Sequence, residues 1–376
     1  MTGPGGRRPG VIRLFLGGDV MTGRGIDQIL AHPGDPVLFE GYMTSALGYV
    51  DLAERRTRPL PRGVAHDYVW GALIDEFQSR RPDLRLINLE TAVTVSDDAA
   101  PKGINYRMNP ANGPVLAAAG INGCMLANNH VLDWGASGLA ETLATLDAAG
   151  IGHAGAGRTG AEAAAPLILA APQGARAIVV AIGCGSSGIP QHWAATAQSP
   201  GVALVPEDPA AAVAAVRRSL GAIRSPGDIL AISVHWGGNW GYEIPPSQRM
   251  IAHALIDEAG ATIVYGHSSH HPKAVELHRG RPILYGCGDL LNDYEGIAGH
   301  EQFRGNLALA WFADIEAATG ALAALDMVPF RIEGFRLVRP DAEEIAWIGR
   351  TMQRECGRVG RGVSVTDGGA LRLLAG

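Results

Sequence analysis

The feature that most constrains the fold is a series of short apolar runs that each end close to a polar residue of the metal-ligand type. Runs of this length, bounded by glycine or polar residues, predict buried β-strands. The runs and the residues that follow them are 11–16 before Asp19, 84–89 before Glu90, 121–127 before Asn128-Asn129-His130, 229–234 before His235, 262–265 before His267, and 283–285 before Cys287.

Segments with helical periodicity lie between these predicted strands, at 67–80, 138–149, 209–223 and 247–258. Strands that alternate with helices predict an α/β sheet covered on both faces. The last third differs, because its strand-like segments follow one another with short turns. These segments, at 274–279, 281–284, 307–314 and 321–331, predict a second, antiparallel sheet, followed by a helix at 342–354.

Polar residues at the ends of parallel strands are expected to form a site, because open α/β sheets bind ligands at the carboxyl ends of their strands. Three histidines within residues 267–271 are costly to bury unless they are hydrogen-bonded or bind a metal. Carboxylate, amide and imidazole groups together suit a divalent metal such as Mn, Fe or Zn, and two-metal sites are a recurring catalytic device. Each signal alone has a structural alternative, such as a turn at Asp19 or a helix cap at Asn128-Asn129.

Composition excludes several classes of protein. The 376 residues carry a net charge of −6, whereas a nucleic-acid binder usually shows a basic patch, so no nucleic-acid partner is expected. The four cysteines stand apart, which argues against a zinc ribbon and a disulfide framework. The apolar run after residue 10 is too short for a membrane span or a signal peptide. We therefore expect a soluble, cytoplasmic protein without a membrane span.

The ordered motifs resemble those of the CapA family, named for a poly-γ-glutamate capsule protein, within the calcineurin-like metallophosphoesterase superfamily. The resemblance covers residues 11–315 and implies a four-layer α/β/β/α sandwich of two mixed sheets. Residues 316–376 would be a strand–helix extension packed on this domain, and residues 1–10 a disordered tail. The motifs are Gly-Asp-Val-Met (18–21), Asn-Leu-Glu (88–90), Ala-Asn-Asn-His-x-x-Asp-x-Gly (127–135), Ser-Val-His-Trp-Gly (233–237), Gly-His-x-x-His (266–270) and Tyr-Gly-Cys-Gly-Asp (285–289).

The resemblance implies one or two divalent cations, with Mn, Fe, Zn, Co and Ca not distinguished by such ligands. The implied metal ligands are Asp19 and His270 at metal one, Glu90 as the bridge, and Asn129, His235 and His267 at metal two. His130 would be an acid/base or oxyanion contact, and Asp133 would orient it. The phosphoesterase motif Asp-x-His has Met21 in place of its histidine, which puts ordinary phosphoester hydrolysis in doubt.

Further residues near the motifs could bind substrate or transfer protons. Lys102 and Arg107 could hold an anionic group, or belong to a solvated loop. Trp236 and Trp240 follow His235 in a glycine-rich loop and could wall a pocket, or pack beneath the loop. A second acid/base opposite His130 could come from Cys287, Asp289 or His300.

Three functions fit this pattern. The favoured hypothesis is a metal-dependent isomerase that epimerises a Cα centre in a peptide, with a ribosomal precursor peptide as one candidate substrate. The damaged first motif, the aromatic loop and the spare acid/base groups favour it. The alternatives are a metal-dependent hydrolase of a phosphoester or a poly-γ-glutamate-type amide, and a non-catalytic component of polymer synthesis.

Overall fold

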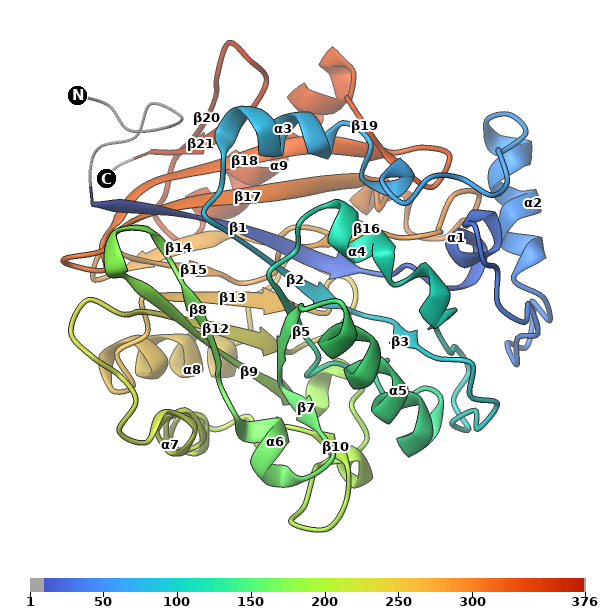
Figure 1. The fold of residues 1–376 in the computed structure, drawn as a ribbon. Coiled ribbons are helices and arrows are strands. Elements are labelled where there is room, and N and C mark those ends of the chain that lie inside the picture. Colours follow the sequence, from blue (N-terminus) through green and yellow to red (C-terminus); the bar gives the residue numbers. More distant parts are fainter. Residues whose placement is uncertain (1–9, 375–376) are drawn as a thin grey trace.

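The computed structural model describes residues 10–374 and contains two large mixed sheets (Figure 1). The predicted tail at 1–10 therefore lies outside the described residues except for Gly10. Within the described range, the ten-stranded sheet contains, in order, β20 (Val363–Val365), β21 (Leu371–Leu373), β18 (Leu322–Ile332), β17 (Leu307–Glu316), β1 (Val11–Val20), β2 (Leu84–Leu89), β5 (Gly123–Met125) and β6 (Gly152–Ala154), with β16 (Asp289–Leu291) beside β1 and β19 (Leu337–Val338) beside β18.

The second sheet has seven strands in the described part of the chain. Its order is β11 (Leu204–Val205), β9 (Arg176–Cys184), β12 (Ile229–His235), β13 (Ile263–His267), β15 (Arg281–Leu284) and β14 (Val275–His278), with β8 (Leu167–Ala170) beside β9. Two small ribbons pair β7 (Ala156–Gly157) with β10 (Gly201–Val202) and β3 (Ala92–Val93) with β4 (Arg107–Met108).

Nine α-helices lie within the described range. They are α1 (Arg24–Ile29), α2 (Leu47–Arg56), α3 (Leu73–Arg80), α4 (Pro114–Ala118), α5 (Gly135–Ala148), α6 (Gly160–Ala164), α7 (Pro209–Leu220), α8 (Pro246–Asp257) and α9 (Ala342–Gly357). The four predicted helices between strands correspond to α3, α5, α7 and α8, and the predicted C-terminal helix corresponds to α9.

Three apolar layers hold the sheets and helices together. Side chains on successive strand residues point to opposite faces, so Leu14 and Leu16 of β1 face the second sheet while Phe15 packs against α3. The layer between the sheets also contains Val179 of β9, and α9 closes one end of it. A third layer joins the seven-stranded sheet to α7 and α8. The molecule is thus the expected α/β/β/α sandwich (Figure 1).

The expectation of a separate antiparallel sheet in the last third is wrong. Strands β17 and β18 join the ten-stranded sheet, where β17 is antiparallel to β1, whereas β15 joins the seven-stranded sheet parallel to β13. An unpaired strand edge is a liability, and pairing of the late strands with β1 and β13 covers edges of the two sheets. Both sheets are therefore mixed.

Glycines near the end of β1 bring its backbone against Gly288, the residue before β16. A Cβ atom on Gly18 would lie 1.7 Å from the carbonyl oxygen of Gly288. The adjacent amide of Asp19 donates to that same oxygen at 3.0 Å. This contact fixes where Asp19 projects.

We predict that Gly18→Ala lowers the free energy of unfolding by about 1–3 kcal/mol, as overpacking in a tight interior does. Gly103→Ala is the matched control, because nothing lies within 4 Å of the added carbon there. Chemical denaturation of both variants measures the difference. Equal stability of the two variants would contradict the close approach of β1 to Gly288.

Candidate metal centre

Four ligand-type side chains converge at the carboxyl ends of strands from both sheets. Asp19 is the last residue but one of β1, and Glu90 follows β2. His235 and His267 end β12 and β13 as directly paired residues. One ligand atom each from Asp19, Glu90 and His235 lies within 4.8 Å of the others. Nδ1 of His267 lies 3.2 Å from Oδ1 of Asp19. At most 4% of any of these four residues is exposed.

The two histidines carry ring nitrogens that are left without hydrogen bonds. Among the described residues, Nδ1 of His235 and both ring nitrogens of His267 have no hydrogen-bond partner. The short distance from His267 to Asp19 lacks hydrogen-bond geometry. A buried polar atom without a partner is costly, and imidazole nitrogen beside carboxylate oxygen is a normal donor set for a divalent metal. These residues therefore fit the metal that the sequence predicts.

The acid–base state of the cluster also suits a cation. Burial lowers the pKa of His235 to about 3, so the ring is neutral and its nitrogen lone pair is free. Burial acts to raise the pKa of Asp19, but His267 and His235 outweigh it and hold that pKa below its usual range. Burial and the charge of Asp19 raise the pKa of Glu90. Two carboxylates so close together repel unless a positive charge lies between them.

Amide side chains from neighbouring strands hold these donors in place. Nδ2 of Asn88 donates to Oδ1 of Asp19 at 2.8 Å. Nε2 of His235 lies 3.0 Å from Oδ1 of Asn129. Asn128 in turn donates to the carbonyl oxygen of Leu89 at 2.9 Å. Asn129 thus lies next to His235, as the resemblance implies, while Asn88 is a supporting residue.

Ser268 supports Asp19 through a strained backbone. Its φ angle of 88° lies in the left-handed region, which a serine rarely adopts. In this conformation its amide donates to Oδ2 of Asp19 at 3.0 Å, and its hydroxyl donates to the carbonyl of Gly237. Strain of this kind concentrates at functional sites.

His130 faces the cluster and is held by two partners. Its Nδ1 lies 2.6 Å from Oδ2 of Asp133, and its ring stacks on Tyr106 at 3.9 Å. Its Nε2 lies 3.9 Å from Oε1 of Glu90. Burial lowers the pKa of His130 to about 4 although Asp133 opposes this. Asp133 therefore orients a neutral His130, and Lys102 contacts Asp133 at 2.8 Å.

His270 and Asp289 form a second pair beside Asp19. Nδ1 of His270 lies 3.0 Å from Oδ1 of Asp289, and Asp289 is the register partner of Asp19. Burial acts to lower the pKa of His270, but Asp289 outweighs it and raises the pKa. Trp240 lies over His270 with ring centroids 5.1 Å apart. The role of His270 as a ligand to a first metal stays a prediction.

Four of the predicted site residues pack against other parts of the molecule. Trp236 packs in the core beneath α8, and its Nε1 donates to the carbonyl of Tyr285. Cys287 lies in the core between the sheets, where burial raises the pKa of its thiol. Arg107 lies over Trp134 and donates to backbone carbonyls. His300 is exposed and stacks on Trp240 at 4.2 Å.

A buried arginine near His130 was not predicted from the sequence. Arg24 is 2% exposed and forms ion pairs with Asp293 and Glu40. Its guanidinium carbon lies 4.8 Å from the centroid of the Tyr106 ring, on which His130 stacks. No motif marks Arg24, because its partners come from sequence positions far from it.

Comparison with known proteins gives three findings. The model of the family "Bacterial capsule synthesis protein PGA_cap" matches residues 13–294. A "Probable polyglutamine synthesis accessory protein" of Mycobacterium tuberculosis H37Rv is 45% identical over 355 residues, which cover 94% of this chain and 93% of that protein. The "PGA biosynthesis protein CapA" of Bacillus subtilis is 26% identical over 285 residues, covering 75% of this chain and 64% of that protein.

A solved structure described as a "novel phosphatase" from Mycoplasma pneumoniae is also similar. It is 11% identical, its match covers 88% of this chain and 95% of that one, and the TM-score is 0.43. In the described part of the chain, no helix has the length and apolar character that crossing a membrane requires.

The expectation of a peptide epimerase is wrong. Relatives that are 45% identical over 94% of the chain are named polyglutamine synthesis accessory proteins and not epimerases. The structure supplies a physical reason, since two of the three groups considered as the second acid/base are poorly suited to proton transfer at the cluster. Cys287 is in the core with a raised thiol pKa, and His300 is exposed on Trp240.

We predict that Asn88→Ala weakens binding of Mn²⁺ by about 10–100-fold, as the loss of an outer partner of a metal ligand does. His130→Asn should leave metal content unchanged, because the His130 ring is held by Asp133 and Tyr106 and we expect it not to be a metal ligand. Equilibrium dialysis of each variant against Mn²⁺ measures both effects. Loss of metal from His130→Asn would identify His130 as a ligand.

Proposed function

This chain belongs to the bacterial capsule synthesis protein family PGA_cap, and we propose that it is an accessory protein in the synthesis of a glutamine- or glutamate-based polymer. The name of the 45% identical relatives, polyglutamine synthesis accessory protein, supports a polymer of this class. The observation that carries the proposal at the level of the site is the buried set of His235 and His267 beside Asp19 and Glu90, in which both ring nitrogens of His267 lack a hydrogen-bond partner.

The metal would be held by Asp19, Glu90, His235 and His267, with Asn129 beside His235. A divalent cation supplies positive charge that attracts carboxylate and amide oxygens. Such oxygens recur along a chain of glutamate or glutamine units, so the ligand is a peptide-like polymer. A ribosomal precursor peptide has no comparable support from the relatives.

Residues of the chain itself would hold the polymer next to the metal. Lys102 contributes a cationic amine close to His130, 3.4 Å from its Nδ1. Trp240 is half-buried beside His270 and offers an aromatic surface to the methylene groups of the polymer. His130, oriented by Asp133, contributes a neutral Nε2 close to Glu90. The cytoplasmic location expected from the sequence stays a prediction.

Complementation tests this function. In a mycobacterial strain that lacks its related protein, expression of this chain should restore polymer, measured as glutamate and ammonia released on acid hydrolysis of the polymer fraction. The double variant Asp19→Ala/His235→Ala should restore none, because it removes two metal ligands. His32→Ala, which changes an exposed histidine, is the control. Full restoration by the double variant would exclude a role for the metal centre.

A binding measurement separates an accessory role from hydrolysis. We expect the Mn²⁺-loaded protein to bind oligoglutamine in isothermal titration calorimetry and to leave its mass unchanged, whereas protein treated with a chelator should not bind. Shortening of the peptide, detected by mass spectrometry, would contradict the non-catalytic role and identify a hydrolase.

A further inference from the structure

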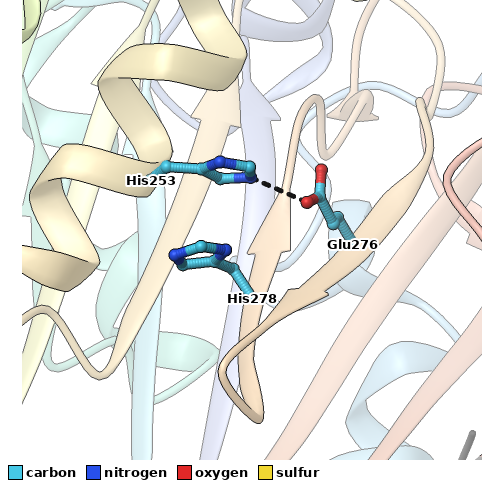
Figure 2. Close-up of side chains that lie close together, drawn as sticks. All are labelled: His253, Glu276 and His278. Carbon is cyan, nitrogen blue, oxygen red and sulfur yellow. Dashed lines mark hydrogen bonds and ion pairs between the residues drawn. The ribbon is translucent and has the colours of Figure 1, made fainter.

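A second group of ligand-type side chains lies between α8 and β14. His253 projects from α8, while Glu276 and His278 project from one face of β14 (Figure 2). One ligand atom of each lies within 4.8 Å of the others. Nε2 of His253 lies 2.7 Å from Oε1 of Glu276. Two imidazoles and one carboxylate are a known ligand set for zinc.

This group is separate from the metal centre at the strand ends. His278 pairs with Arg281, the first residue of β15, and β15 is parallel to β13. His267 lies at the last residue of β13. The group therefore lies toward the end of the seven-stranded sheet opposite to the strand ends that carry His267 and His235.

Neighbouring side chains orient two of the three ligands. The hydroxyl of Tyr285 donates to Oε2 of Glu276 at 2.8 Å, which leaves Oε1 facing His253. Nε2 of His278 lies 2.9 Å from Oδ1 of Asp257, so Nδ1 is the nitrogen left to bind a metal. A carboxylate bound to the far nitrogen of a histidine ligand is the usual outer partner in zinc sites.

The two imidazole rings stack with centroids 4.0 Å apart and an angle of 12° between their planes. Two protonated rings at this distance would repel each other, whereas a metal binds the neutral ring. Two arginines lie nearby but contact outer oxygens. Arg249 lies 3.6 Å from Oε2 of Glu276, and Arg279 lies 3.1 Å from Oδ1 of Asp257. Oε1 of Glu276 is therefore left to the histidines.

We propose that His253, Glu276 and His278 form a zinc site with a fourth position open to solvent. Ligand atoms around tetrahedral zinc lie roughly 3.4 Å apart, given bonds of about 2.0–2.1 Å. Small side-chain movements bring the present atoms to that spacing, and they are free to occur because the three side chains are 15–30% exposed. The ion would join α8 to β14.

Metal stoichiometry tests the site in the full chain. Asp19→Ala/His235→Ala serves as the background, so that the first centre does not contribute. Dialysis against Zn²⁺, followed by metal analysis, should find one equivalent bound. Adding His278→Ala or Glu276→Gln should remove that equivalent, whereas adding His32→Ala should not. With Co²⁺ in place of zinc, the background should show the intense visible absorption of a four-coordinate ion.

Two results would overturn this site. One is equal zinc binding in the background protein and in its His278→Ala derivative. The other is a weak, six-coordinate Co²⁺ spectrum in the background. Circular dichroism and thermal unfolding of each variant verify that folding is retained, and Glu276→Gln keeps the side-chain shape if an alanine variant unfolds. Because the background lacks the first centre, failure of this site leaves the proposed polymer function untouched.

Discussion

Parallel strand pairs in two facing sheets bring together polar side chains that would be separately hydrated in the unfolded chain. Asp19 and Asn88 are register partners in one sheet, and His235 and His267 are register partners in the other. The apolar layer between the sheets sets the distance between the two pairs. Buried carboxylates and imidazoles are costly without compensation, so the donor cluster depends on this packing and favours a cation that would neutralise it.

The sandwich and the positions of the donor residues were predictable because buried strands of an α/β sheet are recognisable in the sequence as short apolar runs. Asp19, Glu90, His235 and His267 each stand within three residues of the end of such a run, and parallel strands align their carboxyl ends. The assignment of late strands to a separate sheet failed, because strand pairing between β1 and β17 joins residues that are far apart in the sequence. Local periodicity holds no information about such partners.

Side-chain direction explains the other differences from expectation. Trp236 and Cys287 stand next to or near ligand positions in the sequence, yet both pack in apolar layers, Trp236 with α8 and Cys287 between the sheets. Arg24 and the group of His253, Glu276 and His278 escaped prediction for the opposite reason. Their partners come from different elements, and only folding brings them together. The choice of an epimerase rested on spare acid/base groups whose directions the sequence does not contain.

The pairing of β1 with late strands has a consequence for biosynthesis. Asp19 obtains its neighbour Asp289 only after 270 further residues have been added to the chain. At about 5–20 residues per second this takes roughly 15–50 seconds. During that time β1 can pair with β2 but not with β16 or β17, and the edge that these late strands will cover is exposed to other chains. The last donor of the cluster, His267, is added only after about 70% of the chain has been made, so a metal could meet the full set of four donors only in the last third of translation.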